Sequence, residues 1–196
     1  MNVTIEELNK LISTKLMKAG LTEEHANVVA DVLVHADARG YHSHGAMRVE
    51  YYAERIAKGG LNADPVISFE KTGPSTAIYD GDNGVGHFMA KEAMTEAINI
   101  AKESGIAAVG VRNIGHSGAL SYFVQQAADE GMIGISVCQS DPMVVPFGGT
   151  EPFYGTNPIA FAAPSSTDEK IIFEAGQLMR MAKQQLIHLK LKHYFQ

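Results

Sequence analysis

The residues best suited to chemistry lie in one short stretch, GYHSHGAMRVEYY, at residues 40–52. His42 and His44 flank Ser43, and Arg48 follows His44 by four positions. An H-x-H pair can bind zinc with a third ligand, but no C-x-x-C, H-E-x-x-H or Asp-rich loop supports a metal. The guanidinium of Arg48 matches a carboxylate, and a helix from about His44 would put both residues on one face. An anion site and a solvated loop therefore both stay open, with metal binding the weakest reading.

A further histidine lies in the stretch VRNIGHSGALSYFVQQAA at residues 111–128. His116 follows an expected strand that ends near Arg112, and it precedes an expected helix. Proteins of the α/β class bind ligands at the carboxyl ends of strands. Ser117 is a candidate cap for that helix, whose first amides would then be able to hold an anion. His116 is thus either a group that exchanges a proton with a ligand or a purely structural hydrogen-bonding residue.

Two further stretches, rich in proline or glycine, are also candidates. CQSDPMVVPFGGTEPFYGTNPIAFAAP, at residues 138–164, has five prolines and three glycines, which predicts a fixed irregular path and either a functional loop or a simple crossover. GDNGVGH, at residues 81–87, reads G-x-x-G-x-G instead of the dinucleotide fingerprint G-x-G-x-x-G. It therefore predicts a turn before a helix and not a Rossmann site.

These candidates must be positioned by alternating helices and strands. A capping box formed by Thr4 and Glu7 predicts a helix over residues 4–19, and apolar periodicity predicts two more over 22–38 and about 45–58. Beyond them we expect strands at 66–71, 75–80, 106–112, 131–140, 157–164 and 170–175, and helices at 86–105 and 120–130. The 106–112 strand reads as buried. The pattern predicts a mixed α/β layer with both faces covered.

Composition narrows the class of protein. The chain has 196 residues, a formal net charge of -6 and a single cysteine, Cys138. An acidic chain lacks the electrostatic footprint of a nucleic-acid-binding protein, and one thiol fits a reducing compartment. The start MNVTIEELNK lacks the basic and apolar parts of a signal peptide, and no apolar run approaches the ~20 residues that span a bilayer. We expect a cytoplasmic protein with no membrane or nucleic-acid partner.

The motifs together resemble the type-2 malate/L-lactate dehydrogenases. The resemblance rests on R-G-x-x-S-H-G-x-x-R at residues 39–48, on G-H-x-G at 115–118 and on the 138–164 stretch, and it extends from Met1 to about Phe173. It implies a homodimer with a fold of its own, distinct from the Rossmann fold, that oxidises small 2-hydroxy acids with NAD or NADP. Of these acids it favours ureidoglycolate, oxidised to oxalurate in allantoin breakdown, over malate, lactate or sulfolactate.

The resemblance also implies roles for particular residues. His116 would be the general base that takes the hydroxyl proton, Arg48 would bind the substrate carboxylate, and His44 would orient the substrate. Ser43 lies in the same substrate-binding motif. On the cofactor side the matching positions are Ser140, Asn157 and Pro158. No metal is implied.

The sequence departs from the family pattern after Phe173. Where the family continues F-D-M-A-T, residues 173–177 read F-E-A-G-Q, and residues 177–196 contain no acidic residue. We expect a helical segment with the substrate motif at 1–60, a partial cofactor-binding α/β region at 61–173 and a divergent basic tail at 174–196. This pattern favours a truncated or frame-shifted reading frame.

Two alternatives to an active dehydrogenase follow from that departure: an inactive remnant of one, and a module that only binds carboxylates. In either case apolar faces would be left uncovered, chiefly at residues 143–147 and 133–140.

Overall fold

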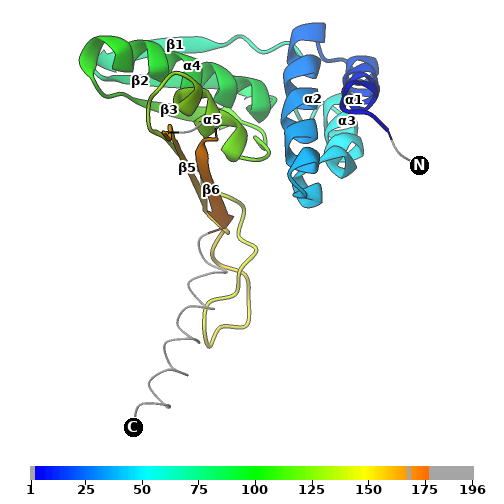
Figure 1. Ribbon diagram of the computed structural model, residues 1–196. Helices are drawn as coiled ribbons and strands as arrows, with labels where there is room; N and C mark the ends of the chain where they lie inside the picture. Colours follow the sequence, from blue (N-terminus) through cyan, green and yellow to red (C-terminus); the bar gives the residue numbers. More distant parts are fainter. Residues whose placement is uncertain (1–2, 167–168, 177–196) are drawn as a thin grey trace.

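The computed structural model describes residues 3–166 and 169–176, so the predicted basic tail at 174–196 lies outside the described residues from residue 177 onward. Three helices form a bundle at one end of the molecule: α1 (Ile5–Ala19), α2 (Glu23–Ala38) and α3 (Val49–Ala57). Figure 1 shows this bundle beside the α/β part. None of the described helices combines the length and apolar character that spanning a bilayer requires.

The first two helices begin where their caps predict. Thr4 accepts the amide of Glu7 at 3.1 Å, and the carboxylate of Glu7 accepts the amide of Thr4 at 2.9 Å. Gly20 ends α1 with a φ of 118°, and the side chain of Thr22 caps α2 by accepting the amide of His25. These local signals confirm the predicted helical character of this part of the chain.

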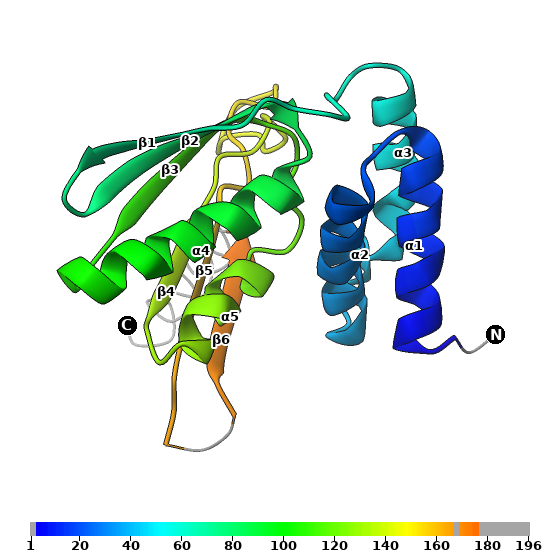
Figure 2. The ribbon, with the colours of Figure 1, turned by 90° about the horizontal axis from the view of Figure 1, so that it is seen from above.

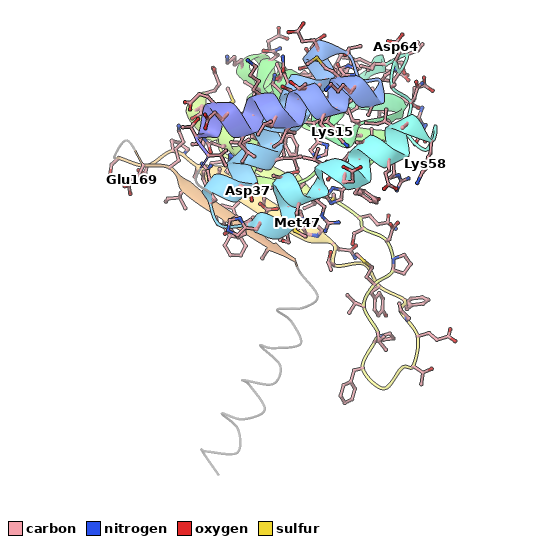
Figure 3. All side chains as sticks on the ribbon, turned by 90° about the vertical axis from the view of Figure 1, so that its right-hand side faces the viewer. Lys15, Asp37, Met47, Lys58, Asp64 and Glu169 are labelled. Atoms are coloured by element: carbon pink, nitrogen blue, oxygen red, sulfur yellow. The ribbon has the colours of Figure 1, made fainter. Side chains whose placement is uncertain are left out.

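The third helix begins later than predicted. The helix expected from about residue 45 starts only at Val49, and Ala46–Arg48 form a 3-10 turn, η2, instead. A further 3-10 turn, η1 (His42–His44), precedes it. The cause is Asp37 of α2, labelled in Figure 3, whose carboxylate accepts the amide of Ala46 at 2.7 Å. That carboxylate lies against Gly45, where an added Cβ would come within 2.2 Å of Asp37 Oδ1. A residue without a side chain is therefore needed at Gly45.

The α/β part contains two small sheets. The first has the order β1 (Ser68–Gly73), β2 (Thr76–Gly84) and β3 (Ala108–Ile114), antiparallel between β1 and β2 and parallel between β2 and β3. The helix α4 (Gly86–Ser104) makes the crossover between the parallel strands. The second sheet is antiparallel and consists of β4 (Gly134–Val137), β5 (Pro158–Ala163) and β6 (Ile171–Gly176). The helix α5 (Ser121–Asp129) packs on it, and Figure 2 shows α4 and α5 beside one another.

Two apolar clusters hold these parts together. The first joins the helical bundle to the start of α4 and includes Leu16, Val29 and Met89. The second lies between α5 and the second sheet, and Val32 of α2 belongs to it. Because α2 contributes to both clusters, the bundle is packed against the α/β part through buried side chains.

The sheets are less enclosed than the sequence pattern predicts. Residues of β3 alternate between exposed and partly covered, so the prediction of a buried strand there is wrong. In the second sheet, Ile135, Phe161 and Phe173 are paired across the three strands and all three are exposed. The opposite face carries Ala160 and Ala162, both fully buried. Within the described residues, helices cover only one face of this sheet, and we call the exposed one the outer face.

Candidate active site

The two histidines of the H-x-H pair have different partners. His42 Nδ1 lies 2.8 Å from Asp37 Oδ1, whereas His44 Nδ1 lies 3.0 Å from Ser43 Oγ. Within the described residues, no three His, Cys, Asp or Glu side chains are grouped so as to hold a metal ion. His42 thus contacts Asp37 of α2, whereas His44 contacts the neighbouring Ser43 of its own motif.

Arg48 is anchored by only part of its guanidinium. Its Nε donates to the backbone carbonyl of Ser43 at 2.7 Å. No described residue bonds the two terminal amino groups, which leaves the two-point donor fork for a ligand. The charge of Arg48 acts on His44 and on His116, and in both cases it lowers the histidine pKa. Arg48 and the two imidazoles therefore belong to one electrostatic cluster.

His116 lies in the connection between β3 and α5. The end of β3 is fixed to β2, because the amide of Gly115 donates to the carbonyl of Gly84 at 2.9 Å. Two chain segments approach closely here, and a Cβ on Gly86 would lie 2.1 Å from the carbonyl oxygen of Gly115. Gly118 has a φ of +80°, a conformation that favours glycine. The backbone on either side of His116 is thus tightly constrained.

The cluster brings together residues that are far apart in sequence. The rings of His44 and His116 are 5.8 Å apart between centroids. Tyr52 Oη lies 2.7 Å from His116 Nδ1, and the amide of Gly118 donates to the same nitrogen at 3.2 Å. Four of the predicted residues, Ser43, His44, Arg48 and His116, therefore lie in one site, to which Tyr52 is an addition.

Burial sets the protonation of the two imidazoles. Desolvation is the largest cause that lowers the pKa of His116 to about 4, and His44 and Arg48 lower it further while Asp141 opposes them. Desolvation also lowers the pKa of His44. Both rings are neutral near pH 7, so each has one nitrogen able to accept a proton. A carboxylate bound at Arg48 would offset the positive charge and make both rings stronger bases.

Sequence reasoning missed two buried members of the site. Tyr52 is only 2% exposed, and desolvation raises the pKa of its hydroxyl. His87 is fully buried, its pKa is lowered to about 3, and neither ring nitrogen has a hydrogen-bond partner among the described residues. Tyr52 had a signal, because it follows Arg48 by four positions on the same helical face. His87 ends the 81–87 stretch, which the sequence indicated only as a turn before a helix.

The expected anion site at the start of α5 is occupied from within the chain. The helix begins at Ser121, so the prediction that Ser117 caps it is wrong. The amides of Leu120 and Ser121 donate to the two carboxylate oxygens of Glu174, at 2.9 and 3.0 Å. Glu174 belongs to β6, which continues to Gly176, beyond the point where the resemblance was expected to fade. These two amides are therefore not available to a ligand.

The three residues predicted on the cofactor side lie at the base of one loop. The hydroxyl of Ser140 accepts the amide of Thr156 at 2.8 Å, and the amide of Ser140 donates to Asn157 Oδ1 at 3.2 Å. Asn157 has a positive φ of 39°, and Pro158 begins β5. The loop they close has one further bridge, between Val144 and Tyr154. Figures 1 and 3 show it, in yellow, extending away from the body.

This loop base fits a neutral, hydroxyl-rich ligand better than a charged one. Ser140 and Asn157 supply uncharged donors and acceptors, the chemistry that suits ribose hydroxyls or a carboxamide. Most of that capacity is already used between the two ends of the loop. Asp141 follows directly and is close enough to His116 to raise the histidine pKa. The loop base and the histidine cluster are therefore neighbours.

The fold defined by the three-helix bundle and the two sheets is that of known 2-hydroxy-acid dehydrogenase structures. The malate dehydrogenase of Pyrococcus horikoshii OT3 superposes with a TM-score of 0.86 at 44% identity, over 90% of this chain and 50% of that one. The sulfolactate dehydrogenase of Methanocaldococcus jannaschii gives a TM-score of 0.84 at 37% identity, over 94% of this chain and 56% of that one.

Sequence comparison identifies the family. Residues 3–176 match the family described as Malate/L-lactate dehydrogenase, and the chain belongs to that family. It is 60% identical over 174 residues to the ureidoglycolate dehydrogenase (NAD(+)) of Escherichia coli K12, covering 89% of this chain and 50% of that protein. It is 42% identical to the malate dehydrogenase of Pyrococcus abyssi, over 94% of this chain and 51% of that protein. The chain thus spans about half the length of the curated relatives it matches.

Proposed function

We propose that this chain carries the substrate-binding and proton-accepting groups of an NAD-dependent 2-hydroxy-acid dehydrogenase, with ureidoglycolate as substrate and oxalurate as product. The observation that carries the proposal is the meeting of Arg48, His44 and His116 in one cluster, in a chain 60% identical to a ureidoglycolate dehydrogenase. A carboxylate-binding cation beside a neutral imidazole is what oxidation of a 2-hydroxy acid requires.

The reaction divides between these groups as follows. The terminal amino groups of Arg48 bind the substrate carboxylate in two-point geometry. His44, held through its Nδ1 by Ser43, orients the substrate through its other nitrogen. As the carbon–hydrogen bond breaks, the substrate O–H bond also breaks and its proton passes to His116. Neutralisation of Arg48 by the carboxylate raises the basicity of His116 in the complex.

The cofactor side of the proposal assigns NAD to the region of Ser140, Asn157 and Pro158. NAD, when bound, supplies the acceptor for the hydride. Ser140 and Asn157 hold the base of the 141–156 loop in one conformation through their mutual hydrogen bonds. Their role is thus to position the loop. Any acceptor atoms of Ser140 and Asn157 that the loop does not use would bind uncharged groups of the cofactor.

The test is a nicotinamide-absorbance assay on the purified 196-residue chain with NAD and ureidoglycolate, and with malate, lactate and sulfolactate in parallel. We expect turnover to be fastest with ureidoglycolate. His116→Ala removes the proton acceptor, and we expect kcat to fall by about 10²–10⁴-fold. Arg48→Ala removes the carboxylate contact, and we expect KM to rise by about 10–100-fold.

Arg55→Ala is the matched control for the arginine change. Arg55 lies on α3, seven positions after Arg48, and its Nη1 donates to the hydroxyl of Tyr51 at 2.7 Å on an exposed surface. We expect its kinetics to equal those of the unchanged chain. A folded chain without turnover, or turnover that survives both active-site changes, would contradict the proposal. Binding of ureidoglycolate without any turnover would favour the carboxylate-binding module.

A further inference from the structure

The carboxylate of Asp37, on α2, contacts the substrate-binding motif at two points. Its Oδ1 accepts a hydrogen bond from Nδ1–H of His42 at 2.8 Å, and its Oδ2 accepts one from the backbone amide of Ala46 at 2.7 Å. The direction of both bonds is fixed, because a carboxylate only accepts. A single side chain of α2 therefore holds both ends of the 42–46 segment.

The guanidinium of Arg48 depends on that same segment. Its Nε donates to the carbonyl of Ser43 at 2.7 Å, and the backbone amide of Arg48 donates to the carbonyl of Gly45 at 2.9 Å. Both carbonyls lie inside the 42–46 segment. The direction in which the guanidinium points is therefore set by the backbone of these five residues.

The carboxylate has little room to move. Its side chain is 19% exposed, and Gly45 packs so closely on it that an added Cβ would overlap both oxygens and the carbon between them. Within the described part of the chain no ion pair joins Asp37 to Arg48, so the contact between them runs through the backbone. A negative charge beside an anion site is unfavourable by itself, so its hydrogen bonds must account for its place.

We propose that Asp37 is a positioning residue for the substrate carboxylate: by holding the backbone of residues 42–46, it fixes the carbonyl that orients the guanidinium of Arg48. The inference rests on the proposed function for the role of Arg48. It assigns to a residue of α2 a part in substrate binding that needs no contact with the substrate.

Two changes at Asp37 separate its contacts from its charge. Asp37→Ala removes both contacts, and we expect KM for ureidoglycolate to rise by about 10-fold while kcat falls by less than about threefold, because His116 lies on another segment. Asp37→Asn keeps the shape, since its amide oxygen accepts from Ala46 and its amino group donates to the other tautomer of His42. We expect its KM to stay within about threefold of the original. A role through charge alone requires KM to fall in both variants, and that result would overturn the proposal.

His42→Ala tests the same contact from the solvent side. The side chain of His42 is 76% exposed, so its removal preserves the fold, and we expect KM to rise by about threefold. This variant decides the question should Asp37→Ala fail to fold. Asp31→Asn is the matched control, because Asp31 is exposed on the same helix and accepts from Asn9 at 2.6 Å, and we expect its kinetics to be unchanged. An unchanged KM in folded Asp37→Ala or in His42→Ala would overturn the proposal.

Nitrogen NMR of the arginine side chains gives a readout that needs no turnover. The Nε–H signal of Arg48 is assigned by its loss in Arg48→Lys, and its exchange with solvent is slow while the proton is donated to Ser43. We expect exchange to be several-fold faster in Asp37→Ala and in His42→Ala, and unchanged in Asp31→Asn.

A purely structural role has a different signature. It lowers thermal stability and leaves both the exchange of the Arg48 signal and KM unchanged, and this outcome would overturn the proposal. If the unchanged chain oxidises none of the acids, the proposed function fails, while the NMR comparison still decides whether Asp37 holds Arg48 in place.

Discussion

Two histidines of this chain show how a single contact fixes the state of an imidazole. Arg39 Nη1 lies 3.0 Å from His35 Nδ1, and since a guanidinium only donates, Nδ1 must be the acceptor. The proton of neutral His35 is therefore on Nε2, 3.2 Å from the hydroxyl of Ser121. The same reasoning applies to His116, because the amide of Gly118 donates to its Nδ1 at 3.2 Å. The proton of neutral His116 is therefore also on Nε2.

Buried neutral histidines make the stability of the chain depend on pH. Burial is the largest cause that lowers the pKa of His35 and of His116 to about 4 and that of His87 to about 3. The unfolded chain binds protons on these residues near pH 6.5, whereas the folded chain does not. The stabilisation is thus complete above about pH 6.5 and is lost as the pH falls toward 4.

We therefore predict that the free energy of unfolding decreases from pH 7 to pH 5, by up to about 1.4 kcal/mol per pH unit for each of the three histidines. Urea denaturation at half-unit intervals of pH measures it. His87→Phe removes one buried imidazole and should make the slope shallower. A flat profile above pH 5, where most carboxylates are still ionised, would contradict the prediction.

The sequence grouped three of the candidate residues, but it did not predict the contacts between distant parts of the chain. Ser43, His44 and Arg48 lie within six positions of one another, so local spacing was enough to group them. Tyr52 and His116 are 64 positions apart, and Leu120 and Glu174 are 54 apart. No cap, turn or apolar period relates residues at such separations. For the same reason the sequence predicted a cap from the nearby Ser117. In the structure the distant Glu174 accepts the first amides of α5 instead.

The helix α5 depends on a side chain from another element. Glu174 of β6 accepts from two amides in the first turn of α5, a favourable place for a negative charge. We predict that Glu174→Gln lowers the free energy of unfolding by about 1–2 kcal/mol, because one charge-assisted acceptor becomes a donor amide. Thermal or urea denaturation at pH 7 measures this.

Glu70→Gln on β1 is the matched control for Glu174→Gln. Glu70 is exposed, so the same chemical change there should leave stability within about 0.5 kcal/mol of the original. Faster hydrogen exchange at Leu120 and Ser121 in Glu174→Gln would locate the loss at the helix start. Equal exchange and equal stability would show that water caps α5 as well as the carboxylate does.

The molecule as a whole presents apolar side chains on the outer face of its second sheet. Ile135 is 64% exposed and Val137 69% exposed, and the Phe161 and Phe173 rings stack beside them at 5.3 Å. The uncovered apolar segments predicted at 133–140 and 143–147 are confirmed, since Met143 and Val145 are also exposed. A contiguous exposed apolar surface of this kind promotes association.

We predict that the double change Ile135→Thr and Val137→Thr reduces concentration-dependent self-association, measured by light scattering. Threonine keeps the β-branched shape that suits a strand, so stability should change by less than about 1 kcal/mol. Ala160→Thr is the control on the opposite, fully buried face, and there we expect a clear loss of stability. Undiminished scattering from the double variant would mean that another surface drives association.

The contact between Glu174 and α5 also bears on how the chain is made. The N-terminal part of a protein emerges from the ribosome first, so the bundle and α4 emerge well before β6. Until Glu174 has emerged, the nascent α5 has two first-turn amides with no carboxylate to accept them. The three-helix bundle contains its own caps at Thr4 and Thr22 and can become ordered early. The strand β6 therefore completes the helix that follows His116, and the geometry of the site is set only after β6 has emerged.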